Sequence, residues 1–254
     1  MPSAVGPGDP TELVIDELMP DLRGSFPVTE QHHSSVAQDG TPILNRRSGY
    51  IRYIDINALI ALAKACRICV YVERRVGQFV PAGVPLVRVS AREGVPTDHA
   101  LHLIAAFDIG PTRTMQQDVE FGIIQIADIA LRAMSPSIND PSTAISCVDQ
   151  LSRIMILWIS RVPPPSQYYA PPHVLRVVVP WMSVDGLLDT AFEQIRHYAA
   201  ADAAVSLRLM RAFRSSECPH GRVCRRTTRR ISSPHSISAL RAPCSRMSSS
   251  ASSR

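Results

Sequence analysis

Long hydrophobic runs are missing from this chain of 254 residues. Its most apolar stretches, residues 56–65, 154–159 and 174–179, are shorter than the roughly 20 residues that a transmembrane helix needs. Residues 1–10 also lack a basic stretch followed by an apolar core, which is the pattern of a secretory signal. We therefore expect no transmembrane segment in this chain, a cytoplasmic and reducing compartment, and no structural disulfides.

Lysine is almost absent, since Lys64 stands alone beside 26 arginines. Residues 76–86, with Gly77 and Gly83 at turns, resemble a segment of biotinyl and lipoyl carrier domains, which hold their attachment lysine at a hairpin tip. Lys64 precedes this segment within a helical pattern, so carrier function is excluded. The sequence also lacks a Walker loop, a G-x-S-x-G elbow, an H-E-x-x-H pair and a G-x-G-x-x-G loop, which excludes the enzyme classes that depend on them.

The positive charge of the chain is confined to its C-terminal end. The formal net charge is +5, but residues 214–254 contain nine arginines and one acid, so residues 1–213 carry a charge of −3. These last residues include twelve serines and show no hydrophobic period, which predicts a disordered tail. Because an arginine-rich, lysine-poor chain indicates a GC-rich gene, we expect the tail to be translated out of frame. Nucleic-acid binding by the tail is the least favoured function, and we expect no nucleic-acid partner.

Hydrophobic periodicity divides the rest of the chain into a β-rich part and a helical part, which predicts an α+β fold. The predicted units are residues 1–43, a linker with one short helix; residues 44–110, a small β-rich unit; residues 111–213, a mainly helical unit; and residues 214–254, the tail. Within the β-rich unit we expect a helix over residues 56–65 and strands within residues 49–55, 67–74, 84–89 and 101–107. The helical unit is expected to include one strand, at residues 174–179.

Two long apolar patterns in the helical unit predict a pair of helices, residues 118–134 and 141–159. Because only about six residues connect them, we expect the two helices to pack antiparallel. Asp149 and Arg153 are four residues apart on the polar face of the second helix, which is the spacing of an ion pair. A further helix is expected to begin after Ser183 as its N-cap.

The connection between these two helices contains two prolines with separate structural roles. Pro136 disfavours a helical conformation at Ser135, so the first helix ends there. Pro141 keeps Asp140 extended, as an N-cap residue should be, and itself suits the first helical turn. The sequence therefore predicts a helix–loop–helix corner in which Ser135, Pro136, Asp140 and Pro141 are structural residues.

With these segments in order, roughly residues 10–213 resemble the C-terminal portion of a bacterial family of predicted integral membrane proteins, known as domain of unknown function 2254. The residues that carry the resemblance are Ser48-Gly49-Tyr50-Ile51 with Asp55, Gly77-Gln78-Phe79-Val80 with Gly83 and Pro85-Leu86, Arg113-Thr114, Gln117-Asp118, Phe121-Gly122, residues 128–133, Ser135-Pro136, residues 138–141 with Thr143-Ala144, Ala191-Phe192 and Gln194-Ile195-Arg196. The resemblance implies a membrane context, with several transmembrane helices preceding this region, and it implies no activity. The partners it implies are the membrane part of the same family or a second copy of the chain.

Six polar residues are candidates for a ligand site: Arg113, Gln117, Asp118, Arg132, Asn139 and Asp140. Asn139 and Asp140 stand at a helix start, where short polar side chains can hold a cation or a ligand, but capping already explains Asp140. The other four could line the same corner, either as a polar site or as a buried ion-pair network. Capping and the ion-pair network are the favoured interpretations.

Cysteine spacing offers only a weak hypothesis of metal or redox chemistry. Cys66 and Cys69 form a C-x-x-C pair, but Cys147 lies within a helix and the other three cysteines lie in the tail. The pair also follows a helix, whereas thioredoxin-like chemistry needs it to open one. We expect no metal and no cofactor.

The favoured function is that of a non-enzymatic, water-facing domain of a membrane protein that serves assembly or sensing. The alternative is an enzyme or metal-binding domain with a polar site around Asn139 and Asp140. A deep cleft in which these side chains converge with Asp118 and Arg113 would favour the alternative, and a filled core there would reject it.

Overall fold

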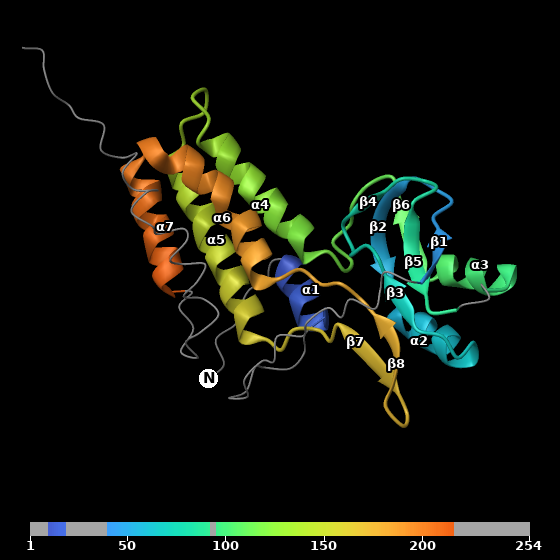
Figure 1. Ribbon diagram of the computed structural model, residues 1–254. Coiled ribbons are helices and arrows are strands. Elements are labelled where there is room, and N and C mark those ends of the chain that lie inside the picture. Colours follow the sequence, from blue (N-terminus) through green and yellow to red (C-terminus); the bar gives the residue numbers. More distant parts are fainter. Residues whose placement is uncertain (1–9, 19–39, 92–94, 216–254) are drawn as a thin grey trace, which may run out of the picture.

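The computed structural model describes residues 10–18, 40–91 and 95–215, which form two units that lie side by side (Figure 1). One unit consists of helices, and the other contains two β-sheets with two further helices. The α+β class predicted from the sequence is confirmed. The predicted tail lies outside the described residues from position 216 onward, as does most of the predicted N-terminal linker.

Three polar side chains begin the helices α4 (Val119–Ala133), α5 (Pro141–Ser160) and α6 (Val184–Tyr198). Asp118, Asp140 and Ser183 each accept a hydrogen bond from the backbone N–H of the third helical residue. The predicted N-cap roles of Asp140 and Ser183 are therefore confirmed. The antiparallel packing of α4 against α5 is also confirmed (Figure 1).

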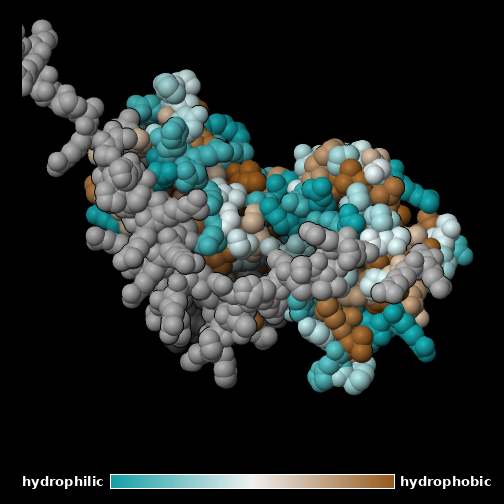
Figure 2. Space-filling view, in the orientation of Figure 1, coloured by the Kyte–Doolittle hydropathy of each residue, from teal (hydrophilic) through white to brown (hydrophobic). Residues whose placement is uncertain are grey.

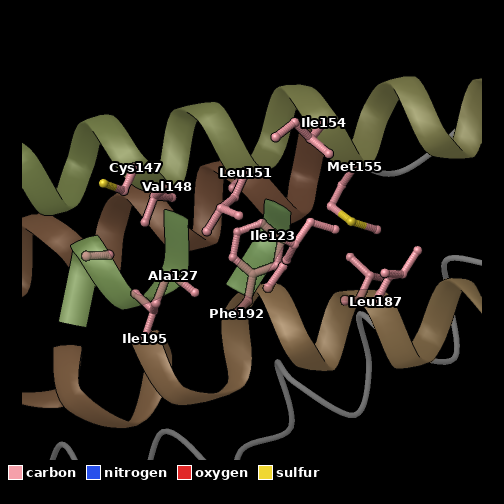
Figure 3. Packing of buried hydrophobic residues seen from close by; sticks show 14 of the residues in the cluster. Ile123, Ala127, Cys147, Val148, Leu151, Ile154, Met155, Leu187, Phe192 and Ile195 are labelled. Carbon is pink, nitrogen blue, oxygen red and sulfur yellow. The ribbon is translucent and has the colours of Figure 1, made fainter. Parts of the chain in front are cut away.

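The core of the helical unit lies between α4, α5 and α6. Leu151 and Met155 of α5 point into the space that Ile123 of α4 and Leu187 and Phe192 of α6 also fill (Figure 3), and all five side chains are fully buried. The unit is completed by α1 (Pro10–Leu18), the short 3₁₀ helix η2 (Ala199–Ala201) and α7 (Ala203–Ser215). α1 packs on α4 and α5, and α7 packs on α5, so all four long helices share one apolar interior.

The β-unit contains a five-stranded sheet, in the order β1-β5-β3-β8-β7, and a three-stranded sheet, in the order β4-β2-β6. The strands are β1 (Thr41–Leu44), β2 (Gly49–Ile54), β3 (Val70–Val72), β4 (Phe79–Val80), β5 (Pro85–Val89), β6 (Phe107–Gly110), β7 (Gln167–Ala170) and β8 (Val174–Val178). Helices α2 (Ile56–Ala65) and α3 (Thr97–Ala105) share one hydrophobic core with both sheets.

The hairpin β7–β8 joins the β-unit from a distant part of the sequence. β8 pairs in parallel with β3, with Val70 opposite Val177 and Tyr71 opposite Val178, although α4 and α5 lie between the two strands in the chain. The chain therefore passes between the units after α1, β6, α5 and β8. The two units accordingly lack the single connecting segment that is typical of hinged domains.

Two local predictions differ from the structure. Residues 101–107 do not form the predicted strand, because α3 extends to Ala105 and β6 begins at Phe107. That run is apolar at nearly every position, so its pattern fits a buried helix as well as a buried strand. The predicted pairing of Asp149 with Arg153 is replaced by longer-range pairs, since Asp149 pairs with Arg208 of α7 and Arg153 pairs with Glu12 of α1.

Candidate functional site

Four charged side chains cluster where the N-terminus of α4 meets the β-unit. Asp118, the N-cap residue of α4, accepts hydrogen bonds from Arg113 Nε and Nη2 at 2.7 and 2.8 Å. Glu120 accepts one from Arg113 Nη2 at 3.1 Å and one from Arg75 Nη1 at 2.8 Å. Because Arg75 follows β3, this junction cluster ties the β-unit to α4. Acids and bases alternate along it, and their formal charges cancel.

The junction cluster is largely shielded from water, with the Asp118 side chain 3% exposed and the Glu120 side chain 14% exposed. Burial would raise the pKa of the Glu120 carboxyl, but the hydrogen bond from Arg75 and the charges of Arg75 and Arg113 outweigh it and lower that pKa. Burial likewise disfavours the charged form of Arg113, yet its bonds to Asp118 and Glu120 raise its pKa. Both groups therefore stay ionised near neutral pH, and neither is poised to exchange a proton with a substrate.

A glycine and an aromatic ring lie directly against these charges. Gly77 has a φ of +85°, and a Cβ atom at this position would lie 2.4 Å from Asp118 Oδ2. The guanidinium carbon of Arg113 lies 5.3 Å from the centre of the Phe121 ring, within the range of a cation–π interaction. The loop after β3 is therefore fitted against Asp118 at a distance that only glycine permits.

A small cavity borders the junction cluster. Its lining includes Arg75, Asp118 and Glu120 on the polar side, with Trp158 and Trp181 among its apolar residues. Its volume of about 30 Å³ suits one or two water molecules, because a single water needs roughly 10–15 Å³. Pockets for small-molecule ligands measure roughly 300–1,000 Å³, so this cavity does not accept a metabolite or a cofactor.

Gln117 belongs to the same junction. Its side-chain Oε1 accepts a hydrogen bond from the Ile54 N–H at 3.0 Å, and its Nε2 donates to the Ile54 carbonyl at 3.4 Å. It thereby satisfies both backbone groups of the last residue of β2. The structure thus brings Arg113, Gln117 and Asp118 together, and it uses all three to fix the start of α4 against the β-unit.

The other three candidate residues, Arg132, Asn139 and Asp140, lie at the opposite end of α4. The 15 residues of this helix separate its two ends by about 20 Å at 1.5 Å per residue. The six candidates therefore form two groups and do not share one site.

At the helix corner, the Asp140 carboxylate is used to start α5. Oδ1 accepts from the Thr143 N–H at 3.1 Å, and Oδ2 accepts from the Thr143 hydroxyl at 2.6 Å. The hydrogen bond from the Thr143 side chain, together with that from its backbone, lowers the pKa of Asp140. The Asp140 N–H donates to the Ala133 carbonyl at 2.8 Å and closes the loop. Asn139 has a φ of +46°, a left-handed conformation that asparagine tolerates better than most residues.

Sequence reasoning missed two members of the junction cluster, Arg75 and Glu120. Glu120 carried a detectable signal, because acidic residues are favoured in the first turn of a helix. Arg75 carried none, since 45 residues separate it from Glu120 and only the tertiary fold brings the two together.

Cys66 and Cys69 of the C-x-x-C pair lie in the segment between α2 and β3. Cys66 and Cys69 are both free thiols. Burial raises the pKa of Cys69, although a hydrogen bond with Tyr71 and the charge of Arg176 act to lower it. A raised pKa leaves less of the nucleophilic thiolate at neutral pH. Within residues 10–18, 40–91 and 95–215, no three His, Cys, Asp or Glu side chains gather in a way that could hold a metal ion.

No helix in the described part of the chain combines the length and the hydropathy needed to cross a bilayer.

Comparison with known proteins identifies relatives over most of the chain. The family described as "Predicted membrane protein (DUF2254)" matches residues 14–215. An uncharacterized protein of Mycobacterium bovis and two of Mycobacterium tuberculosis are each 33% identical to this chain over 201 residues, which is 78% of this chain and 38% of each relative. The chain thus spans less than half the length of these relatives, and no solved structure matches it. Because the family match covers both units, the chain belongs to the family described as "Predicted membrane protein (DUF2254)".

Proposed function

We propose that this chain is a water-facing domain of a membrane protein and that it serves assembly or sensing and not catalysis. The observation that carries this proposal is the junction cluster, in which every charged side chain is bonded to another member of the same cluster. The family description supplies the membrane context. In this proposal the two units behave as one rigid domain, because internal ion pairs connect them.

An enzyme would need a polar group that is free to meet a substrate. Asp118 is held by both Arg113 and the Phe121 N–H, and the adjoining cavity of about 30 Å³ admits only water. Asp140 is committed to Thr143 through both carboxylate oxygens. The alternative of an enzyme or metal-binding domain at Asn139 and Asp140 is therefore less favoured.

The β7–β8 hairpin is the surface that we propose for assembly. Among the described residues, β7 is the last strand of the five-stranded sheet. Tyr169 is 54% exposed and Val174 is 42% exposed on this hairpin, and Figure 2 shows hydrophobic surface over it. A strand at a sheet edge, flanked by exposed apolar side chains, favours pairing with another protein chain. The proposed partners are the membrane part of the same family or a second copy of this chain.

Protease accessibility tests the water-facing placement. In sealed vesicles that contain an intact mycobacterial relative, we expect protease added on one side to release a folded fragment equivalent to residues 14–215 without detergent. Release from neither side, or retention of that fragment in the bilayer after an alkaline wash, would overturn the placement.

Sedimentation of the full chain tests the assembly surface. We expect Tyr169→Asp to weaken association with a second copy or with the purified membrane part of a relative. Tyr198→Asp is the matched control, because Tyr198 is an aromatic residue with 63% exposure at the end of α6, away from the hairpin. Equal effects of the two variants would reject the hairpin as the interface.

A further inference from the structure

A surface groove between α5 and α7 has a chemistry different from that of the junction cluster. Its volume is about 680 Å³, which lies within the range of roughly 300–1,000 Å³ seen for ligand sites. The groove is lined by Asp149, Ser152, Arg153, Ile156, Arg208, Arg211 and Ala212. Three arginines therefore surround it and one acid opposes them.

Two arginines of the groove, Arg153 and Arg208, retain donors for a further anion. Arg208 donates hydrogen bonds from Nε and Nη2 to the Asp149 carboxylate, and Arg153 forms an ion pair with Glu12 through Nε. A guanidinium has five N–H donors, so each of these side chains can bond a second acceptor without releasing its carboxylate. Arg153 remains 53% exposed and Arg208 39% exposed, so their remaining donors are accessible.

Positive charge predominates on α7, which forms one side of this groove. The described residues before position 214 contain 16 acidic and 16 basic side chains and so carry no net charge, whereas α7 contains arginines and no acidic residue. A local basic surface on a body without net charge is directed toward an anionic partner.

Exposed apolar side chains accompany the arginines. Leu207 and Met210 of α7 are 52% and 51% exposed, and Ile156 of α5 is 43% exposed. Val205, Leu209 and Ala212 form the buried side of α7, so Leu207 and Met210 lie on a different face of this helix. Apolar side chains interspersed with arginines are typical of helices that lie in the interface of an anionic bilayer.

We propose that the α5–α7 groove and the exposed face of α7 dock on the anionic phospholipid surface of the membrane. The arginines would bond lipid phosphates, and Leu207 and Met210 would enter the acyl boundary beneath them. This inference rests on the proposed placement of the domain beside a membrane, and it adds which face is turned toward the lipid.

Vesicle binding by the full chain tests this inference. Sucrose-loaded phosphatidylcholine vesicles with about 30% phosphatidylglycerol provide the anionic surface, and pure phosphatidylcholine vesicles provide the neutral one. We expect Arg211→Gln to lower the partition coefficient for the anionic vesicles about fivefold, as one juxtamembrane charge should. Arg211→Lys should retain binding, because the charge is kept. The double variant Leu207→Ser with Met210→Ser should lower the partition coefficient for the anionic vesicles about tenfold.

Matched controls separate the groove from the rest of the chain. Arg132→Gln removes the same charge from the exposed far end of α4, and Ile138→Ser removes an apolar side chain that is 57% exposed at the corner. Both should leave vesicle binding nearly unchanged. Because residues 214–254 contain nine arginines, vesicle binding that stays as high in the groove variants as in the controls would assign binding to that segment and overturn the inference.

Two further outcomes would also reject lipid docking. Equal binding to neutral and anionic vesicles would show that the arginines do not contribute to binding through lipid charge. Binding of inorganic phosphate that is lost in Arg211→Gln, without any vesicle binding, would make the groove a site for a free anion. The protease experiment on an intact relative tests the water-facing placement independently of vesicle binding. If that experiment shows a water-facing domain but the groove variants bind vesicles normally, only the lipid-docking inference is refuted.

Discussion

α4 and α5 each begin with an N-cap aspartate, but the two aspartates lie in different environments. Asp118 and Asp140 have nearly identical backbone angles, φ −111° and ψ 83° against φ −110° and ψ 85°. Asp118 is buried and shares its carboxylate with Arg113, whereas the more accessible Asp140 uses its second oxygen for the Thr143 hydroxyl. The N-cap residue Asp118 therefore also connects the two units at the start of α4. Asp140, beyond the other end of α4, only caps α5.

The largest expected effect comes from removing one negative charge at the junction. Asp118→Asn keeps an oxygen that can cap α4 but leaves the half-buried Arg113 without its main counter-ion. Breaking a buried ion pair in this way should lower the free energy of unfolding by about 3 kcal/mol. Urea denaturation measures the loss. Asp140→Asn is the same change at the corner and should leave the midpoint nearly unchanged, so equal losses would refute the difference between the two sites.

Gly77 offers a second way to disturb the junction while leaving its charges intact. Gly77→Ala should lower the free energy of unfolding by about 2 kcal/mol or more, because the left-handed backbone is strained and the new Cβ meets Asp118. Gly83 is the matched control: its φ is +83°, but no atom lies within 4 Å of a Cβ at that position. Thermal unfolding should show a smaller loss for Gly83→Ala. Equal losses would mean that backbone strain alone explains the effect.

The ionisation of Glu120 makes the stability that the junction cluster contributes depend on pH. Its pKa lies below the ordinary value of 4.5, so its ionisation stabilises the folded state above that value, and this contribution is lost as pH falls through the lower folded-state pKa. Glu120→Gln should reduce stability by about 1.5 kcal/mol at neutral pH and make the acid limb of the profile of Tm against pH shallower. Glu193→Gln removes a carboxylate from an exposed pair with Arg196 and should change little. An unchanged acid limb in Glu120→Gln would contradict this role.

Local chemistry explains which features could be predicted from the sequence. Asp140 followed by Pro141 specifies a helix start within two residues, and the structure has that cap. The contacts of Gln117 with Ile54 span 63 residues, and they depend on where β2 ends relative to α4. Such contacts leave no periodicity or spacing for sequence reasoning to detect.

The β7–β8 hairpin illustrates the same limit at the level of the fold. The apolar, valine-rich run at residues 174–179 indicates a strand, but it does not indicate that β3 is its neighbour. Parallel pairing requires a crossover connection, and here that connection contains two long helices. The sequence therefore predicts the α+β class and the long helices, whereas α3, the strand β7 and the joining of the two units follow only from the tertiary structure.

The smallest expected effect is at the corner, and it separates capping from chemistry. Asp140→Ala removes both acceptors for Thr143 and should lower Tm by about 3 °C, the usual size of a lost N-cap in a chain of this length. Asp140→Asn should keep Tm nearly unchanged, because asparagine caps a helix about as well as aspartate. Equal falls in Tm for both variants would show that the negative charge of Asp140 matters beyond its hydrogen bonds. The corner would then resemble the junction, and the difference between the two ends of α4 would disappear.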